Sequence, residues 1–181
     1  GVNLEIPDAQ TVALIGKAPG SGRSTLIDLI SGRLRPDSGK IMFCGEDVTM
    51  LLPNQRADMG LACNFPESNL FDELTIADHV LAVARNSEST SNKLYAQWKN
   101  DSRYLKKAFK TLAEIGLHIS METPISELSP VQKKLLGLGL ATLNPVAMLL
   151  WENPVDGLDT SAIREVSSAI REFERKGSAI L

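Results

Sequence analysis

A glycine-rich loop early in the chain has the residue types of a phosphate-binding site. It reads GKAPGSGRST over residues 16–25, between the apolar run TVALI and the helical pattern STLIDLISG. Such a site needs glycines that let backbone N–H groups approach phosphate, a helix N-terminus facing the anion, a cation and a hydroxyl for magnesium. These features come from Gly20, Gly22, Arg23 and Ser24. Because its first glycine, Gly16, comes one position early, the loop alone fits an ordinary glycine-rich turn equally well.

The cation of this loop is an arginine. Guanidinium keeps the positive charge of lysine but is longer and planar, so it can grip a phosphate without placing a compact point charge between two of them. Lys17 lies in the same loop and could supply that point charge. An ordinary solvated loop lysine is the favoured interpretation of Lys17.

The segments around the loop predict alternating strands and helices, and therefore an α/β fold with a largely parallel sheet. Predicted strands are VNLEI, TVALI, two short strands around a Gly-Glu-Asp turn in KIMFCGEDV, MGLACNF, AMLLW and the final SAIL. Predicted helices begin at Ser24, at Thr75, at Ser102 with Leu105, Phe109, Leu112 and Ile115 inward, at Ser129 with Pro130 as its first residue, and after Asp159. Residues 86–101 are predicted to be a surface excursion.

Composition bounds the class of protein. With 181 residues and 43% hydrophobic residues, one domain is expected. A net charge of -3 argues against a direct nucleic-acid ligand. Cys44 and Cys63 have no metal-type spacing and are interpreted as small core residues in a reducing compartment. No apolar run reaches the roughly 18 residues of a membrane span. His79 and His118 are expected to be surface or partly buried polar residues without a catalytic role.

Three motifs in order give these observations a family context. GKAPGSGRST is followed by ELSPVQKK and then by AMLLWENPVDGLD, and LRPDSGKIMFCGEDV and LFDELTIADHV lie between the first two. Over essentially its whole length the chain resembles the ATPase domain of ABC transporters. TPISELS with the GxGRST loop is most similar to the tandem ATPases of sugar importers, and RADMGLA is also similar to amino-acid and lipid exporter relatives.

The resemblance implies a P-loop NTPase fold of the ABC ATPase type, with a largely parallel sheet, a small antiparallel part and a helical signature subdomain at about residues 75–143. Residues 1–181 would be a fragment of a single nucleotide-binding domain, with the aromatic residue that stacks on adenine before Gly1 and a histidine after Leu181. The cofactors implied are ATP and Mg²⁺. ATP contacts would come from Gly20, Ser21, Gly22, Arg23, Ser24, Thr25, Ser129, Gln132 and Asp159, and Mg²⁺ contacts from Ser24 and Glu152.

Several family positions carry other residues here. The glutamine of the second loop aligns with Pro66, which has no side-chain amide. Pro130 and Val131 replace both glycines of the signature, which removes an N–H and adds a branched side chain. Glu152 replaces the magnesium aspartate, and Asn153 replaces the catalytic glutamate. A carboxamide can orient water but cannot accept its proton, and loss of a positioned general base costs about 10²–10⁴-fold in rate.

The leading hypothesis is therefore an ATP-binding domain of an ABC transporter for a sugar or similar small solute, with weak or absent intrinsic ATPase activity. Expected partners are a membrane-spanning subunit and a second nucleotide-binding domain, identical, different or in tandem, at the cytoplasmic face of the membrane. Candidate contacts to the membrane subunit are Phe71, Val80 and Leu81, with the alternative that all three are core residues. The alternative is a scaffold or regulatory module that binds the membrane partner without ATP. A soluble ABC-type ATPase of DNA repair or translation has little support, because the excursion at 86–101 is short and nearly neutral.

Overall fold

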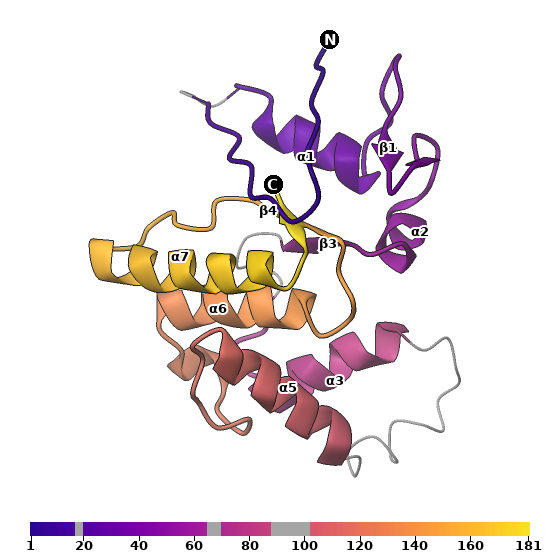
Figure 1. Ribbon diagram of the computed structural model, residues 1–181. Coiled ribbons are helices and arrows are strands. Elements are labelled where there is room, and N and C mark those ends of the chain that lie inside the picture. Colours follow the sequence, from indigo (N-terminus) through magenta and orange to yellow (C-terminus); the bar gives the residue numbers. More distant parts are fainter. Residues whose placement is uncertain (17–19, 65–69, 88–101) are drawn as a thin grey trace. The chain divides into compact units, whose positions relative to one another are not determined.

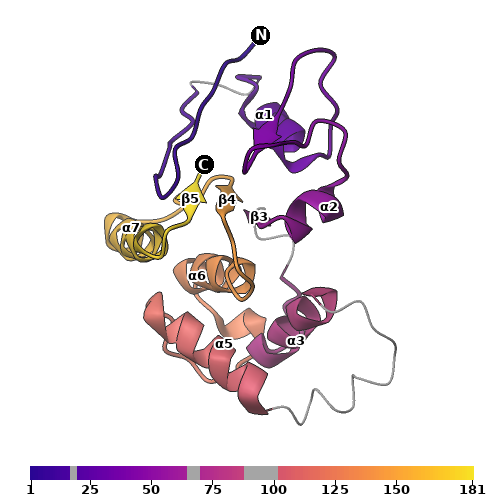
Figure 2. The same cartoon turned by 45° about the vertical axis from the view of Figure 1, so that its right-hand side comes forward.

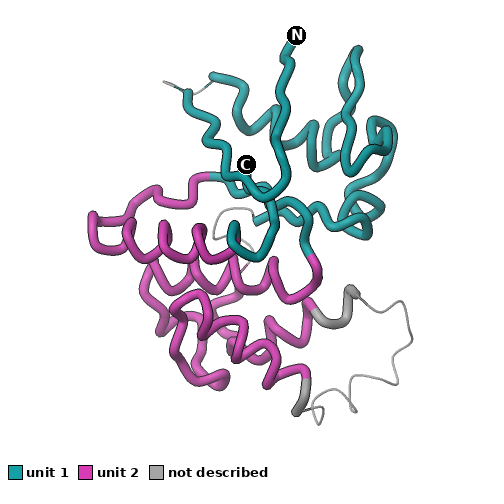
Figure 3. The backbone as a smooth tube through the Cα atoms, viewed as in Figure 1, with its two compact units in different colours: residues 1–64, 146–152, 174–181 teal, residues 65–145, 153–173 magenta. Residues whose placement is uncertain are grey.

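A computed structural model describes residues 1–16, 20–64, 70–87 and 102–181. Their contacts divide the chain into two compact units, coloured teal and magenta in Figure 3. Unit 1 contains residues 1–64, 146–152 and 174–181, and unit 2 contains residues 65–145 and 153–173.

Unit 1 is built on a three-stranded parallel sheet with the order β3-β4-β5. The strands are β3 (Leu61–Asn64), β4 (Met148–Trp151) and β5 (Ala179–Ile180). All four residues of the central strand β4 are buried. A continuous apolar run of this length is typical of a strand covered on both faces, so the sequence prediction for β4 is confirmed.

The first fifteen residues differ from the prediction. Neither VNLEI nor TVALI forms a strand, and the first part of the chain joins the sheet only through a bridge between Thr11 and Ile180. The N–H of Val12 donates to Ile180 O at 2.8 Å, but Ile15 is 88% exposed. Residues 11–15 alternate between exposed and half-buried, so this run is not covered on both faces as the sequence predicted.

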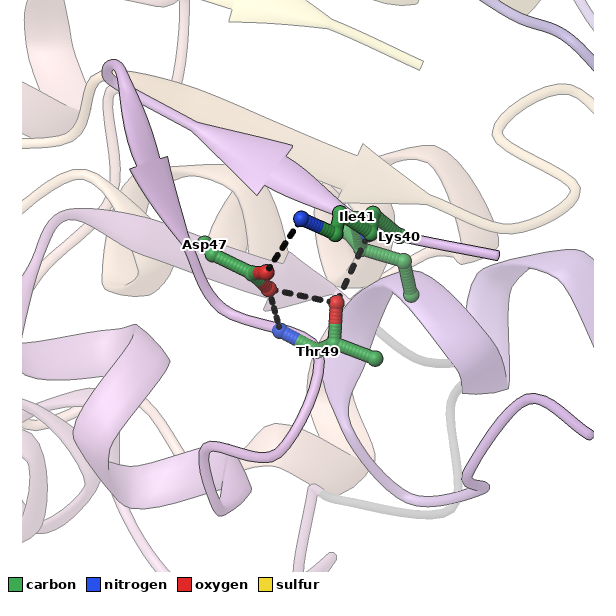
Figure 4. A network of polar contacts seen from close by, with 4 residues as sticks. All are labelled: Lys40, Ile41, Asp47 and Thr49. Carbon is green, nitrogen blue, oxygen red and sulfur yellow. Dashed lines mark hydrogen bonds and ion pairs between the residues drawn. The ribbon is translucent and has the colours of Figure 1, made fainter. Parts of the chain in front are cut away.

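A β-hairpin and two helices complete unit 1 (Figures 1 and 2). The hairpin pairs β1 (Met42–Phe43) with β2 (Glu46–Asp47) in antiparallel register. The two strands were predicted, but the predicted Gly-Glu-Asp turn is wrong, because the turn is at Cys44 and Gly45 while Glu46 and Asp47 pair with β1. Helix α1 (Arg23–Ser31) ends at Gly32 in the left-handed conformation, and helix α2 (Pro53–Asp58) precedes β3. Figure 4 shows the polar contacts that close the hairpin around Asp47 and Thr49.

Unit 2 is helical over most of its described residues. It contains α3 (Ile76–Ser87), α5 (Ser102–Glu114), the 3-10 helix η2 (Ile125–Glu127), α6 (Pro130–Ala141) and most of α7 (Thr160–Arg175). Helices α3, α5 and α6 pack against one another (Figure 1). The expected inward face of α5 is correct for Leu112 and Ile115, which are buried, but wrong for Phe109, which is 48% exposed.

Gly139 marks the close contact between α5 and α6. A Cβ at this position would lie 2.2 Å from Leu112 Cδ2 and 3.2 Å from Ile115 Cδ1. The absence of a side chain therefore lets the two helices approach each other here, which explains a glycine inside a helix that it would otherwise destabilise.

Candidate functional site

The described part of the glycine-rich loop leads directly into the N-terminus of α1. Gly20 and Gly22 have φ angles of +88° and +79°, which favour glycine strongly. Gly22 is the N-cap of α1, and no side chain caps this helix within the described residues. The first backbone N–H groups of α1 therefore have no capping side chain as acceptor, and an anion site requires N–H groups of this kind.

Gly16 has a packing reason that the motif alone does not reveal. A Cβ on Gly16 would lie 2.6 Å from Ser21 Oγ and 3.3 Å from Arg23 Cδ, so these two side chains lie close against this residue. Any other residue would displace Ser21 or Arg23. Lys17 lies outside the described residues.

The structure brings Ser24 and Glu152 together at the end of the parallel sheet. Ser24 lies in the first turn of α1, Glu152 follows β4, and the Ser24 hydroxyl donates a hydrogen bond to Glu152 Oε1. Ser24 is exposed and Glu152 is half-buried, so both oxygens can be reached from solvent. A hydroxyl and a carboxylate are oxygen ligands of the type that Mg²⁺ prefers, and Mg²⁺ sites commonly combine one or two carboxylates with substrate phosphates. The two side chains therefore fit a magnesium ion whose other ligands include the phosphates of a nucleotide.

Asn153 begins a tightly hydrogen-bonded loop of unit 2. Its φ angle of +53° lies in the left-handed region, which asparagine tolerates better than most residues. Asn153 O accepts the N–H of Asp156 at 3.3 Å and the ammonium group of Lys134, from α6, at 3.2 Å. At the other end of the loop, Asp159 Oδ1 accepts the N–H of Ala162 at 2.9 Å and thereby caps α7.

Ser129 and Gln132 form a capping box at the start of α6. The N–H of Ser129 donates to Gln132 Oε1 at 2.8 Å, and the N–H of Gln132 donates to Ser129 Oγ at 3.4 Å. Pro130 is the first helical residue, where its missing N–H breaks no helical bond. The two side chains predicted to contact a nucleotide thus also stabilise their own helix.

Other predicted positions have separate outcomes. Pro66 lies outside the described residues. Val80 and Leu81 are 0% and 8% exposed, so the alternative that they are core residues is the correct one. Phe71 is 61% exposed, and its ring stacks on His79 with a centroid distance of 6.1 Å.

The two histidines and two cysteines were predicted only in part. His118 is exposed, but His79 is buried. Both ring nitrogens of His79 have partners in this buried position, since Nε2 accepts the Phe71 N–H at 3.1 Å and Nδ1 lies 3.0 Å from Thr75 O. Cys44 is exposed, in contrast to the prediction, because it occupies the hairpin turn with a φ angle of +49°. Cys63 is half-buried on β3, and this burial raises the pKa of its thiol to about 11. Cys63 is therefore a poor nucleophile.

Two basic residues with structural roles were missed by the sequence analysis. Arg56 is 1% exposed and donates to backbone carbonyls of α1. Lys134 connects α6 to Asn153. Neither residue type nor spacing distinguishes them from ordinary surface cations, so the sequence offers no signal for either.

In the described part of the chain, no group of three or more His, Cys, Asp or Glu side chains could hold a metal ion. No described helix combines the length and the apolar character that crossing a bilayer demands.

Comparisons with known proteins agree with the geometry. A family model described as ABC transporter matches residues 1–156. The chain is 29% identical to a probable branched-chain amino acid transport ATP-binding protein LivG of Methanocaldococcus jannaschii, over all of this chain and 71% of that protein. It is 26% identical to the ribose import ATP-binding protein RbsA of Streptococcus agalactiae, over 99% of this chain but only 35% of that protein. It also resembles the crystal structure of an ATP-binding cassette of an ABC transporter in its ADP conformation, with a TM-score of 0.84 and 25% identity over 99% of this chain and 72% of that one.

Proposed function

Since this chain belongs to the ABC transporter family, as an ATP-binding domain with the P-loop NTPase fold, we propose that it binds MgATP at the N-terminus of α1 and hydrolyses it poorly. The observation that carries this proposal is the hydrogen bond between Ser24 and Glu152, which joins the phosphate loop to the end of β4. Phosphate groups would be held by the amides that follow Gly20 and Gly22 and by the guanidinium group of Arg23.

Ser24 and Glu152 would hold the magnesium ion, which would neutralise phosphate charge when bound. Glu152 is one methylene longer than aspartate, and Ser24 already lies within hydrogen-bond reach of its carboxylate. Ser21 and Thr25 lie on either side of Ser24 in the sequence and would contribute further polar contacts to the phosphates. Residues 1–181 would form one nucleotide-binding domain, with residues 75–143 as its helical subdomain.

Hydrolysis is proposed to be weak because residue 153 cannot act as a base. The Asn153 carboxamide can orient an attacking water but cannot take its proton, a loss of about 10²–10⁴-fold in rate. Pro66 offers no side-chain amide to the same chemistry. Turnover by the isolated chain is therefore expected near background, and Asn153→Glu alone should not restore it while Pro66 and Arg23 persist. Robust steady-state turnover by either protein would refute this part of the proposal.

The proposed partners are a membrane-spanning subunit and a second nucleotide-binding domain, which would place the chain at the cytoplasmic face of a membrane. Ser129, Gln132 and Asp159 would reach the nucleotide of that second domain. If the second domain has an intact base, the site to which this chain contributes Ser129 is the one that hydrolyses. The name of the branched-chain amino acid relative supports transport of a small solute, and the name of the ribose relative supports import, with a sugar as the first candidate.

A second candidate function is an ATP-independent scaffold for a membrane partner. The observation that favours it is that three family positions, Arg23, Pro66 and Asn153, carry residues other than those of the family. It differs from the first proposal in one respect that can be measured, because a scaffold has no need to bind nucleotide.

Titration with a fluorescent ATP analogue, with and without Mg²⁺ and with unlabelled ATP as competitor, separates the two functions. The ATP-binding proposal predicts competed binding that Mg²⁺ strengthens. Glu152→Gln should remove the effect of Mg²⁺ while leaving Mg²⁺-free binding, and Ser24→Ala should weaken the effect. Glu46→Gln, at an exposed glutamate of β2, is the matched control and should change nothing. Absence of competed binding, also in a longer chain, would favour the scaffold.

A further inference from the structure

Arg56 is a buried cation that holds the C-terminal end of the phosphate-loop helix. Only 1% of the residue is exposed. Its Nη1 donates to Leu29 O at 2.7 Å and to Ile30 O at 2.6 Å, both in the last turn of α1. The guanidinium group therefore satisfies carbonyl groups that a helix end otherwise leaves without a partner.

The other side of the same guanidinium group faces the segment that links the hairpin to α2. Arg56 Nη2 donates to Thr49 O at 3.1 Å, and Nε donates to Leu51 O at 3.2 Å. The Thr49 side chain in turn accepts the N–H of Ile41 at 2.9 Å and donates to Asp47 Oδ1 at 2.6 Å (Figure 4). One side chain thus connects α1, α2 and the hairpin network.

The charge of Arg56 has only neutral acceptors in this environment. Within the described residues it forms no ion pair, and burial lowers the pKa of the guanidinium group. The partial negative charge at the C-terminus of α1 compensates the positive charge of Arg56, because a cation is stabilising at this end of a helix dipole. Burial of such a cation is costly unless each donor is satisfied, so the position of α1 is tightly defined by these bonds.

Gly32 makes room for this contact. A Cβ at Gly32 would lie 2.9 Å from Arg56 Nε and 3.0 Å from Leu51 O, and the φ angle of +84° already favours glycine. The helix stop and the arginine contact therefore depend on the same residue.

We propose that Arg56 is a positioning residue for nucleotide binding, which acts by fixing the orientation of α1 from its C-terminal end. This inference rests on the proposed function, because it assumes that phosphate binds at the N-terminus of α1. Without Arg56, α1 can occupy orientations that do not bind nucleotide. The apparent dissociation constant then rises in inverse proportion to the fraction of molecules with a competent helix.

The test compares Arg56→Met, Arg56→Lys and the control Arg35→Met, which changes an exposed arginine three residues after Gly32. Methionine keeps much of the apolar stem but donates no hydrogen bond. Lysine keeps the charge but loses the planar fork that reaches four carbonyls. Affinity for the fluorescent ATP analogue with Mg²⁺ is measured well below the unfolding midpoint of each variant. We expect the dissociation constant to rise about tenfold for Arg56→Met, about threefold for Arg56→Lys and not at all for Arg35→Met.

The outcomes separate this inference from the function on which it rests. An Arg56→Met variant that is less stable but binds nucleotide as tightly as the wild type would show a purely structural arginine and overturn the proposal. If Arg56→Met does not fold, the affinity of Arg56→Lys decides in the same way. A wild-type chain that binds no nucleotide would instead refute the proposed function, and the role of Arg56 would fall with it.

Discussion

Substitutions of Asn153 should separate the conformational role of this residue from its chemistry. The φ angle of +53° costs an ordinary L-residue about 1–2 kcal/mol relative to the right-handed region, and asparagine and aspartate are the residues that escape most of this cost. Asn153→Glu should therefore destabilise the folded chain. Lys134 complicates a direct comparison with asparagine, because its ammonium group, 3.2 Å from Asn153 O, would attract the new carboxylate and offset part of the cost.

Asn153→Asp is the matched control, since it adds the same charge beside Lys134 but tolerates the left-handed backbone. The difference between the two variants isolates the conformational term, and the glutamate variant should be less stable by about 1 kcal/mol. Urea unfolding at pH 7, followed by far-ultraviolet circular dichroism, measures the free energy of unfolding of each variant. A glutamate variant as stable as the aspartate variant would refute the reasoning that the backbone selects residue 153.

Three further predictions test other contacts. Gly139→Ala should lower the free energy of unfolding by about 1 kcal/mol, because overpacking against buried Leu112 outweighs the gain in helix propensity. In the double variant, Leu112→Val should recover part of this loss. Ser129→Ala should cost about 1 kcal/mol in the same urea assay through loss of the capping box, and no change would contradict that role. A thiol reagent at pH 8 should label exposed Cys44 quickly and Cys63 slowly, since the Cys63 pKa is raised to about 11. The labelling rate of Cys63 should rise about tenfold per pH unit below that value, and Cys44→Ser should remove the fast phase.

Helix starts and strand identities could be predicted from the sequence because their signals are local. Ser129 and Pro130 mark the start of α6, and the Thr75 hydroxyl accepts the Asp78 N–H at 3.1 Å at the start of α3. The run AMLLW is apolar at every position and becomes the buried strand β4. In each case the residues that carry the signal lie within a few positions of the element that they specify.

Contacts between distant segments could not be predicted in the same way. The acceptors of Arg56 lie in residues 29–30 and 49–51, so its burial depends on how two separate segments fold against α2. The burial of His79 likewise depends on the backbone of Phe71. The alternation of VNLEI and the apolar run TVALI are local patterns that do not tell whether a neighbouring strand exists, and this explains the two strands that the structure lacks.

The left-handed conformation of Asn153 also changes what its substitution means for catalysis. If the loss of the base were the only consequence of Asn153, one change to glutamate would recover the family residue. As the first residue of a turn, it is also selected by a backbone that disfavours glutamate, and Lys134 and Asp156 hold its carbonyl oxygen in place. A glutamate introduced here would first have to overcome that conformational cost, and its chain would still carry proline at the glutamine position. The proposed weak hydrolysis therefore has a chemical cause, the missing base, and the left-handed backbone is a separate obstacle to restoring that base with a single substitution.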